Sequence, residues 1–367
     1  MQKRSFLEIV KPYFNVFDGS LALIIFLILC CGSLTVFSAG YDFPGRIEDH
    51  MRNVLVAFVV LWIAALVPPQ LLMRFAVPVY TVGLALLLAV AAFGMVKKGA
   101  RRWLNVGMVI QPSEIMKIAM PLMLAWFFQK REGTINWKDF LLAALLLLVP
   151  VALIARQPDL GTAILVAAAG FYVIFFAGLP WKVLALMTVA ALAAMPVAWH
   201  FLHDYQRARV MTLIDPTTDP LGKGFHIIQS TIAIGSGGIT GKGWLQGTQA
   251  HLEFIPERTT DFIFAVYSEE FGLIGNIVLM VLYLLLIGRG LLIAANAPTL
   301  FARLLAGAIT LIFFTYAFVN MGMVSGILPV VGVPLPFMSY GGTALVTLGL
   351  GAGILMSIHR HRKLVQT

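Results

Sequence analysis

The chain has 367 residues, of which 60% are hydrophobic and only 12% are charged, and its mean hydropathy is +0.90. That composition excludes an ordinary soluble globular domain, in which about a quarter of the residues are charged. The net charge of +9 is typical of a protein beside anionic lipid, so it gives no reason to expect a nucleic-acid partner. Apolar runs of about 20 residues, long enough to cross a bilayer, recur along most of the chain. The sequence therefore predicts an all-α polytopic membrane protein, with residues 1–367 forming a single integral membrane domain.

Ten apolar segments are predicted to cross the membrane as helices. They cover approximately residues 19–39, 53–71, 75–95, 113–128, 139–155, 160–178, 183–201, 262–287, 303–323 and 340–358. The first follows a basic segment, but it is too long for a signal peptide and lacks a small-residue cleavage site, so we expect it to be retained. Cys30 and Cys31 lie within it and are expected to be small buried side chains, not metal ligands.

Basic residues near both ends of the chain predict its orientation. An even number of spans places both termini on one side, and both are basic, with Lys3 and Arg4 at one end and Arg360 and Arg362 at the other. The positive-inside rule places them in the cytoplasm. The long segment 202–261 then lies outside, as do all of the 17 acidic residues except Glu8, Asp18, Glu132 and Asp139. The polar chemistry is therefore expected on the outer face.

The outer segment 97–117, KKGARRWLNVGMVIQPSEIMK, combines a cationic cluster with a charged pair. Four cations in a short outer loop oppose the positive-inside rule, which favours an anionic ligand outside the membrane. Glu114 and Lys117 are three residues apart, so on a helix they share a face and can pair. A structural ion pair between helix ends is one interpretation. Ionisable groups within a span favour the other, a role in a cavity.

Two further outer segments interrupt the apolar pattern. In ARQPDLGT, residues 155–162, Asp159 either pairs with Arg156 across the turn or caps the helix that begins at Leu160, and the cap is the stronger interpretation. In segment 325–343, three prolines and two adjacent glycines exclude a regular helix. Irregular backbone at membrane depth is tolerated only where protein covers it or where it lines a wet cavity.

Asp261 lies where the long outer segment meets the apolar run that begins at Phe262. A partly desolvated carboxylate is a stronger base than one in water, but Asp is also a favoured helix N-cap, so position alone leaves both interpretations open. On a helix from Asp261, the small or polar residues Ala265, Ser268 and Gly272 share its face. Such a stripe faces other helices or a cavity, which favours the catalytic interpretation.

Three other motifs fail. Residues 236–243 resemble a phosphate-binding loop but lack its first Gly and final Ser or Thr. His251 and Glu253 lack the cysteine partners of a zinc deaminase, and His200 and His203 lack further ligands. The outer site then fits an enzyme acting on a lipid-linked substrate or a carrier that moves one. An almost uncharged midplane favours the enzyme.

Several motifs resemble those of the shape, elongation, division and sporulation (SEDS) family, in the same order and over nearly the whole chain. They are GARRW (99–103), QPSEIMK (111–117), QPDLGT (157–162), DYQRARV (204–210), residues 219–243, residues 254–275 and NMGMVSGILPVVGVPLPFMSYGGTA (320–344). GTQAHLEFIPE (247–257) looks more like the elongation branch than the division branch.

The resemblance implies a peptidoglycan glycosyltransferase that polymerises lipid II on the outer face of the bacterial cytoplasmic membrane. Its essential Asp aligns with Asp261, which would be the general base of an inverting reaction. The implied substrate-binding residues are Arg102, Glu114, Lys117, Asp159, Glu257 and Ser339. The older interpretation of the family, a lipid II flippase, is the alternative function.

Further expectations concern cofactors, partners and one departure from the family. No organic cofactor is expected, and Arg102 would stabilise the leaving pyrophosphate alone or with a divalent cation such as Mg²⁺ or Mn²⁺. The implied partners are a class B penicillin-binding protein, the elongation machinery and membrane lipids. Thr259 stands where the family usually has His, which argues against a proton relay through that neighbour but not against Asp261 as the base. The glycine-rich segment before Asp261 is expected to form a mobile wall of the lipid II site.

Overall fold

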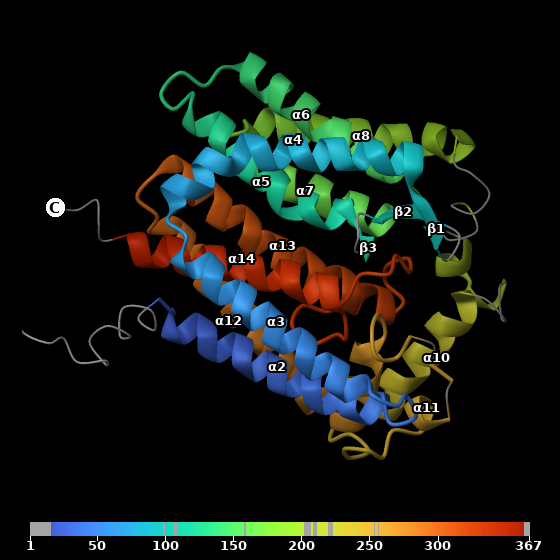
Figure 1. Cartoon of the computed structure of the whole chain (residues 1–367). Helices are drawn as coiled ribbons and strands as arrows, with labels where there is room; N and C mark the ends of the chain where they lie inside the picture. Colours follow the sequence, from blue (N-terminus) through green and yellow to red (C-terminus); the bar gives the residue numbers. More distant parts are fainter. Residues whose placement is uncertain are drawn as a thin grey trace, which may run out of the picture.

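The computed structural model is a bundle of long helices (Figure 1). It describes residues 16–97, 100–105, 109–157, 159–201, 207, 211–218, 223–252, 254–255 and 257–362. Ten of its helices are α2 (Gly19–Ala39), α3 (Arg46–Leu66), α4 (Pro69–Phe93), α5 (Pro112–Gln129), α6 (Trp137–Ala155), α7 (Leu160–Phe176), α8 (Trp181–Phe201), α12 (Ile263–Ala295), α13 (Leu300–Val324) and α14 (Gly342–His361).

Each of the ten predicted spans corresponds to one of these helices. Seven of them are long and apolar enough to cross a membrane, namely α2, α3, α4, α6, α12, α13 and α14, and α7 and α8 contain shorter apolar stretches. Helix α5 differs because most of its residues are buried inside the bundle, including Lys117. The prediction of a polytopic all-α membrane protein is therefore confirmed. Helix α3 begins seven residues before the predicted span because its charged first turns, with Glu48 and Asp49, precede the apolar run.

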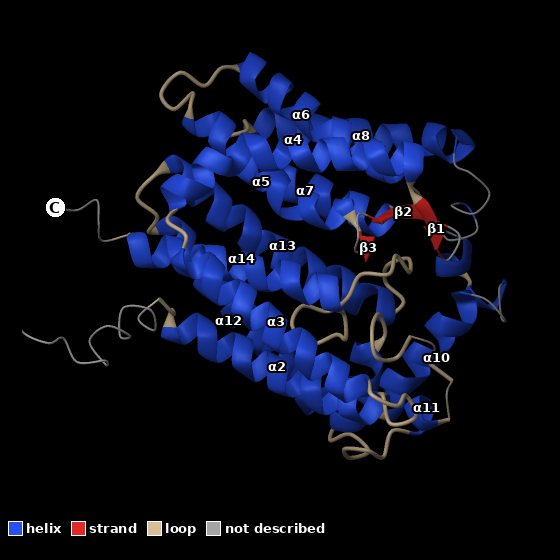
Figure 2. Cartoon of the chain, in the orientation of Figure 1, coloured by secondary structure: helices blue, strands red, loops and turns tan. Residues whose placement is uncertain are grey.

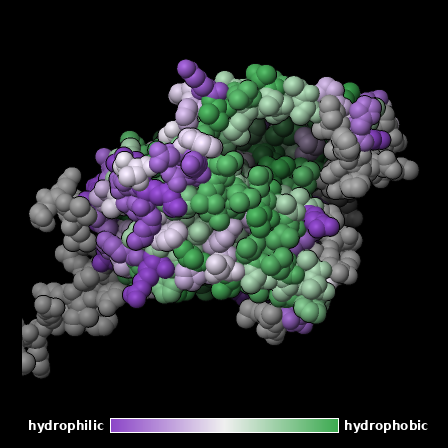
Figure 3. Space-filling model, turned by 90° about the horizontal axis from the view of Figure 1, so that it is seen from above, coloured by the Kyte–Doolittle hydropathy of each residue, from purple (hydrophilic) through white to green (hydrophobic). Residues whose placement is uncertain are grey.

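The bundle has two chemically different ends. Both ends of the described chain lie at the left of Figure 1, and most loops and all described strands gather at the right (Figure 2). We call the right end the site end. It is formed by segments 40–45, 94–97, 100–105, 109–111, 237–252, 254–255, 257–262 and 325–341. Figure 3 shows a broad apolar belt over one face of the bundle, with hydrophilic residues gathered toward the end that holds the termini. This is the pattern expected of a bundle embedded in lipid.

The segments predicted to lie outside the membrane contain strands and short helices. Segment 97–117 contributes to an antiparallel sheet of β1 (Met95–Lys97), β2 (Ala100–Asn105) and β3 (Val109–Ile110). The long segment 202–261 contains a short 3₁₀ helix (Pro216–Thr218), α10 (Lys223–Ser236) and α11 (Thr248–His251). Helix α10 forms because Ile227, Ser230 and Ala233 recur at helical spacing and are buried on one face.

Helix α12 is broken at Gly272, where φ is 63° and ψ is −161°. The glycine-rich segment 237–243 enters this break and satisfies the backbone groups that it exposes. The amides of Lys242 and Gly243 donate to the carbonyls of Glu269 and Glu270, each at 3.0 Å. The amides of Leu273 and Ile274 donate back to the carbonyls of Gly238 and Ile239, at 3.0 and 3.1 Å.

Only glycine fits this junction. A Cβ atom at Gly272 would lie 2.2 Å from the amide nitrogen of Gly241, and one at Gly237 would lie 2.1 Å from the carbonyl of Ser268. The predicted stripe of Ala265, Ser268 and Gly272 is indeed buried, but part of it packs against this segment and not against another helix. Four backbone hydrogen bonds therefore build segment 237–243 into α12. The role of the glycine-rich segment before Asp261 as a mobile wall of the lipid II site stays a prediction.

Candidate active site

Asp261 lies in the turn that leads into α12 at the site end. The N-cap of α12 is Phe262, without a side-chain cap, so Asp261 precedes the cap position and the capping interpretation does not hold. Its side chain is half-buried, and its backbone carbonyl accepts a hydrogen bond from Asn320 Nδ2 at 2.8 Å. Its carboxylate lies against Gly332, where an added Cβ would stand 3.3 Å from Oδ2. The fold thus holds this carboxylate between the start of α12 and segment 325–341.

Segment 325–341 is tied to the turn before Asp261 through Ser339 and Tyr340. The Ser339 hydroxyl donates to the carbonyl of Thr260 at 2.7 Å and accepts from the amide of Leu335 at 2.8 Å. The amide of Tyr340 donates to the carbonyl of Thr259 at 2.9 Å. Ser339 is only 4% exposed, so its hydroxyl is used inside the protein. Ser339 thus positions the turn before Asp261, and its contact with a substrate stays a prediction.

Asp159 is the centre of a second polar cluster, between β2 and the start of α7. Its carboxylate caps α7 by accepting from the amide of Thr162 at 3.3 Å, as predicted. It also accepts from Gln111 Nε2 at 2.9 Å and lies 3.6 Å from Arg102 Nη1. The ionic partner of Asp159 is therefore Arg102 and not the exposed Arg156. Of the predicted cationic cluster, Lys98 and the side chains of Lys97 and Arg101 lie outside the described residues.

Glu114 and Lys117 form the predicted ion pair, with 2.5 Å between Nζ and Oε1. The Lys117 side chain is only 4% exposed and lies 5.2 Å from the centroid of the Tyr316 ring on α13. Glu114 Oε2 accepts from the hydroxyl of Thr347 on α14 at 3.4 Å. The pair thus points into the protein, where it joins three helices, and the structural and cavity-facing interpretations are both compatible with its position.

Residues 331–333 bring the separate parts of the site together. A Cβ at Gly161, two residues after Asp159, would lie 2.8 Å from the carbonyl of Val331. The next residue, Gly332, contacts the carboxylate of Asp261. The start of α7 and the turn before α12 therefore pack against consecutive residues of one segment, although they are about 100 residues apart in the chain.

Glu257 lies at the exposed rim of the same turn. It adopts a left-handed conformation with φ of 49°, and Thr260 Oγ1 donates to its Oε2 at 3.2 Å. Thr259, where the resemblance predicts His, is 3% exposed, and its carbonyl is used by Tyr340. Glu257 is therefore accessible to a ligand from solvent, whereas Thr259 is not.

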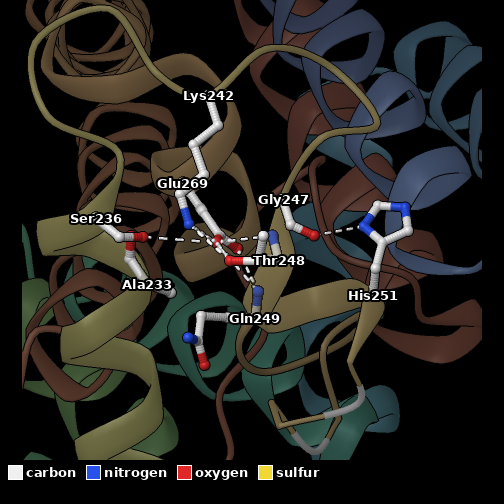
Figure 4. A network of polar contacts seen from close by, with 8 residues as sticks. All are labelled: Ala233, Ser236, Lys242, Gly247, Thr248, Gln249, His251 and Glu269. Carbon is white, nitrogen blue, oxygen red and sulfur yellow. Dashed lines mark hydrogen bonds and ion pairs between the residues drawn. The ribbon is translucent and has the colours of Figure 1, made fainter.

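A buried network around Glu269 holds the segment before Asp261 in place (Figure 4). Glu269 Oε1 accepts from Lys242 Nζ at 2.6 Å, from the amide and hydroxyl of Thr248 at 2.9 and 3.0 Å, and from the amide of Gln249 at 3.1 Å. The Glu269 side chain is fully buried and that of Lys242 is 27% exposed. The network fastens α11 to the first turns of α12.

Three residues that hold parts of the site in place were not predicted from the sequence. Gln111 holds Asp159, Asn320 holds the backbone of Asp261, and Glu269 holds α11. Asn320 carried a usable signal, because an isolated amide within an apolar span needs a partner. Gln111 and Glu269 carried none, since their partners lie at least 20 residues away in the chain.

Within the described part of the chain, no group of three or more His, Cys, Asp or Glu side chains converges on one point. The oxygens of Asp159 are engaged by Arg102, Gln111 and Thr162, and those of Glu114 by Lys117 and Thr347. These two carboxylates therefore do not fit a preformed site for a divalent cation.

The FtsW/RodA/SpoVE cell cycle protein family matches residues 19–364. The chain belongs to this family. It is 52% identical over 350 residues to the peptidoglycan glycosyltransferase MrdB of Escherichia coli K12, covering 95% of each chain. It is 37% identical over 314 residues to MrdB of Helicobacter pylori 26695, covering 83% of this chain and 80% of the relative.

Solved structures share the fold. A chain of a peptidoglycan synthase complex, studied for its coordination of polymerization and crosslinking, has a TM-score of 0.81 at 34% identity and covers 95% of this chain and 98% of its own. The rod shape determining protein RodA of Thermus thermophilus has a TM-score of 0.72 at 29% identity with the same coverage. The predicted membership of the SEDS family, and the likeness to its elongation branch, are confirmed.

Proposed function

We propose that this family member is a peptidoglycan glycosyltransferase that polymerises lipid II during cell elongation. Its similarity to MrdB over 95% of both chains supports the activity. The observation that supports the site is the half-buried carboxylate of Asp261, held against Gly332 where the polar segments of the site end meet. The substrate is a lipid-linked disaccharide, which suits a site at the end of a membrane bundle.

Asp261 is the general base of the proposed reaction. The 4-hydroxyl of the acceptor GlcNAc attacks the anomeric carbon of the donor MurNAc, the bond to the pyrophosphate oxygen breaks, and undecaprenyl pyrophosphate leaves. Asp261 accepts the hydroxyl proton as the new glycosidic bond forms. Because the α-linked donor becomes a β-linked product, the displacement inverts the anomeric centre and needs only one base.

Arg102 stabilises the charge that develops on the leaving pyrophosphate. Its side chain is 29% exposed, and its distance of 3.6 Å from Asp159 leaves donors for a second anion. Gln111 and Arg102 both hold Asp159, so this carboxylate orients the guanidinium group. Lys117 adds positive charge deeper in the protein. No step is assigned to a divalent cation, because the carboxylates near Arg102 do not fit one.

The proposed location is the bacterial cytoplasmic membrane, with both termini in the cytoplasm and the site end outside. The basic last turn of α14 supports this orientation, since cations favour the cytoplasmic side. A class B penicillin-binding protein is the proposed partner. The fold shared with a chain of a peptidoglycan synthase complex supports it.

Polymerisation of labelled lipid II in detergent tests this function. Purified protein with its transpeptidase partner is expected to form glycan strands, and Asp261→Asn is expected to form none while still binding the partner. Detergent micelles offer no bilayer to flip across, so glycan formation separates a polymerase from a flippase. Glycan formation by Asp261→Asn at the wild-type rate would refute the base assignment.

A further inference from the structure

We propose that Asn320 is a positioning residue for the reaction, because it fixes the backbone of Asp261 against the segment that contacts the Asp261 carboxylate. This inference rests on the proposed function of Asp261 as the general base. It concerns a side chain on α13 that the mechanism above does not use.

The two amide hydrogens of Asn320 are both committed. Nδ2 donates to the carbonyl of Asp261 at 2.8 Å and to the carbonyl of Val333 at 2.7 Å. Both partners are carbonyl oxygens, which can only accept, so the nitrogen and not the oxygen of the amide must face them. One side chain therefore clamps two backbone segments that are about 70 residues apart in the chain.

Burial makes this clamp rigid. Asn320 is fully buried, and its Oδ1 has no hydrogen-bond partner among the described residues. The two hydrogen bonds from Nδ2 hold the amide group in this orientation. If the amide rotated, the carbonyls of Asp261 and Val333 would lose their donor, and Oδ1 would gain no partner in exchange. The arrangement thus tolerates one unpaired oxygen to keep two donors in place.

Asn320 holds both the backbone of Asp261 and the segment that borders its carboxylate. Val333 follows Gly332, the residue that lies against Asp261 Oδ2. Asn320 therefore fixes the distance between the main chain of Asp261 and the segment that borders its side chain. Loss of the clamp allows these two parts to separate, and a general base displaced by an ångström loses much of its effect.

Asn320 is distinct from the other ties between these segments. The Ser339 hydroxyl and the Tyr340 amide donate to the carbonyls of Thr260 and Thr259, the two residues before Asp261. Asn320, in contrast, donates a hydrogen bond to the backbone carbonyl of Asp261 itself. Its substitution is therefore expected to affect the base more than the fold of the turn.

Steady-state polymerisation by the complex with the transpeptidase partner tests this role. Asn320→Ala is expected to lower kcat at least about tenfold while the KM for lipid II stays within about twofold. The matched control is Thr315→Val on the same helix, which removes a buried hydroxyl that contacts Tyr172 at 2.6 Å, away from Asp261. The unfolding temperature in detergent checks that both variants are folded, and only Asn320→Ala should lose activity.

Asn320→Asp provides a second readout that a purely structural residue would not move. An ionised carboxylate cannot donate to the two carbonyls, whereas a protonated one donates a single hydrogen bond. The activity of N320D relative to wild type is therefore expected to rise as the pH is lowered. N320D activity equal to that of wild type at every pH, or a ratio that falls with decreasing pH, contradicts the clamp.

The outcomes separate this inference from the proposed function. If Asp261→Asn is inactive and Asn320→Ala matches Thr315→Val in kcat, the positioning role is wrong and the base assignment stands. If Asp261→Asn is active, the base assignment is wrong and the positioning role falls with it. A selective loss of kcat in Asn320→Ala, beside an inactive Asp261→Asn, supports both.

Discussion

Gly332 lies against the carboxylate of Asp261, and a Cβ atom added at Gly332 would stand 3.3 Å from Oδ2. Gly332 also has a φ of 73°, a conformation that side chains rarely adopt. Glycine is therefore favoured at position 332 for two reasons, its positive φ and its contact with Asp261. A comparison with another glycine of the same φ separates the two effects.

Gly332→Ala is expected to lower the rate of lipid II polymerisation at least about tenfold, because the new methyl group displaces the base. The matched control is Gly326→Ala in the same segment. Gly326 has the same φ of 73°, but its added Cβ would meet side-chain atoms of Ile227 and Thr231. Both variants should lose about 1 kcal/mol of stability from backbone strain. Equal activity in the two variants would show that contact with Asp261 is unimportant.

Arg102→Ala is expected to lower kcat/KM for lipid II by about 10- to 100-fold, since a charged hydrogen bond to the leaving pyrophosphate contributes about 1.5–3 kcal/mol. The dependence of the initial rate on lipid II concentration measures this effect. Arg156→Ala is the control, because Arg156 is an exposed arginine close in sequence to Asp159. A similar loss of kcat/KM in both variants would indicate a general effect of charge and not a specific contact.

Lys242→Met is expected to destabilise the protein more than Glu269→Gln. It leaves the fully buried Glu269 carboxylate without its cation, and breaking a buried ion pair in this way costs about 3–5 kcal/mol. Glu269→Gln removes the buried charge and keeps a side-chain oxygen that accepts from Thr248 and Gln249, so about 1.5–3 kcal/mol is expected. Unfolding in detergent measures both, with the exposed Lys182→Met as a control that should change little. The reverse order of the two losses would contradict the network.

Stability is expected to fall in acid through Asp18, the N-cap of α2. Burial alone would raise its pKa, but hydrogen bonds from Arg289 and the amide of Leu21, and the nearby His359, hold its pKa below the ordinary value of 3.8. A lowered folded-state pKa gives stability that is present above the unfolded-state pKa of about 4 and is lost as the pH falls through the folded-state pKa. The unfolding temperature of wild type should therefore fall more steeply below about pH 5 than that of Asp18→Asn. Parallel curves would exclude this contribution.

The extent to which the sequence predicted the site differs between residues. The pair of Glu114 and Lys117 and the helix cap by Asp159 were predictable, because their partners are three residues apart and local geometry decides them. The tie between Ser339 and the turn before Asp261 was not predictable, because its partner, the carbonyl of Thr260, is 79 residues away. The ionic partner of Asp159 was likewise decided by the fold, which brings Arg102 to it across 57 residues of chain.

The sequence by itself determined the class of this protein and most of its helices. Apolar runs must form helices in lipid, since each backbone group needs a partner within its own segment. It also marked segment 325–341 as irregular, because proline and glycine there cannot sustain a helix. Only the tertiary structure decided what that segment does. Its residues 331–333 border both the start of α7 and Asp261, and Asn320 clamps it to the Asp261 backbone. Such contacts depend on hydrogen bonds and steric fit between distant segments, which no local pattern encodes.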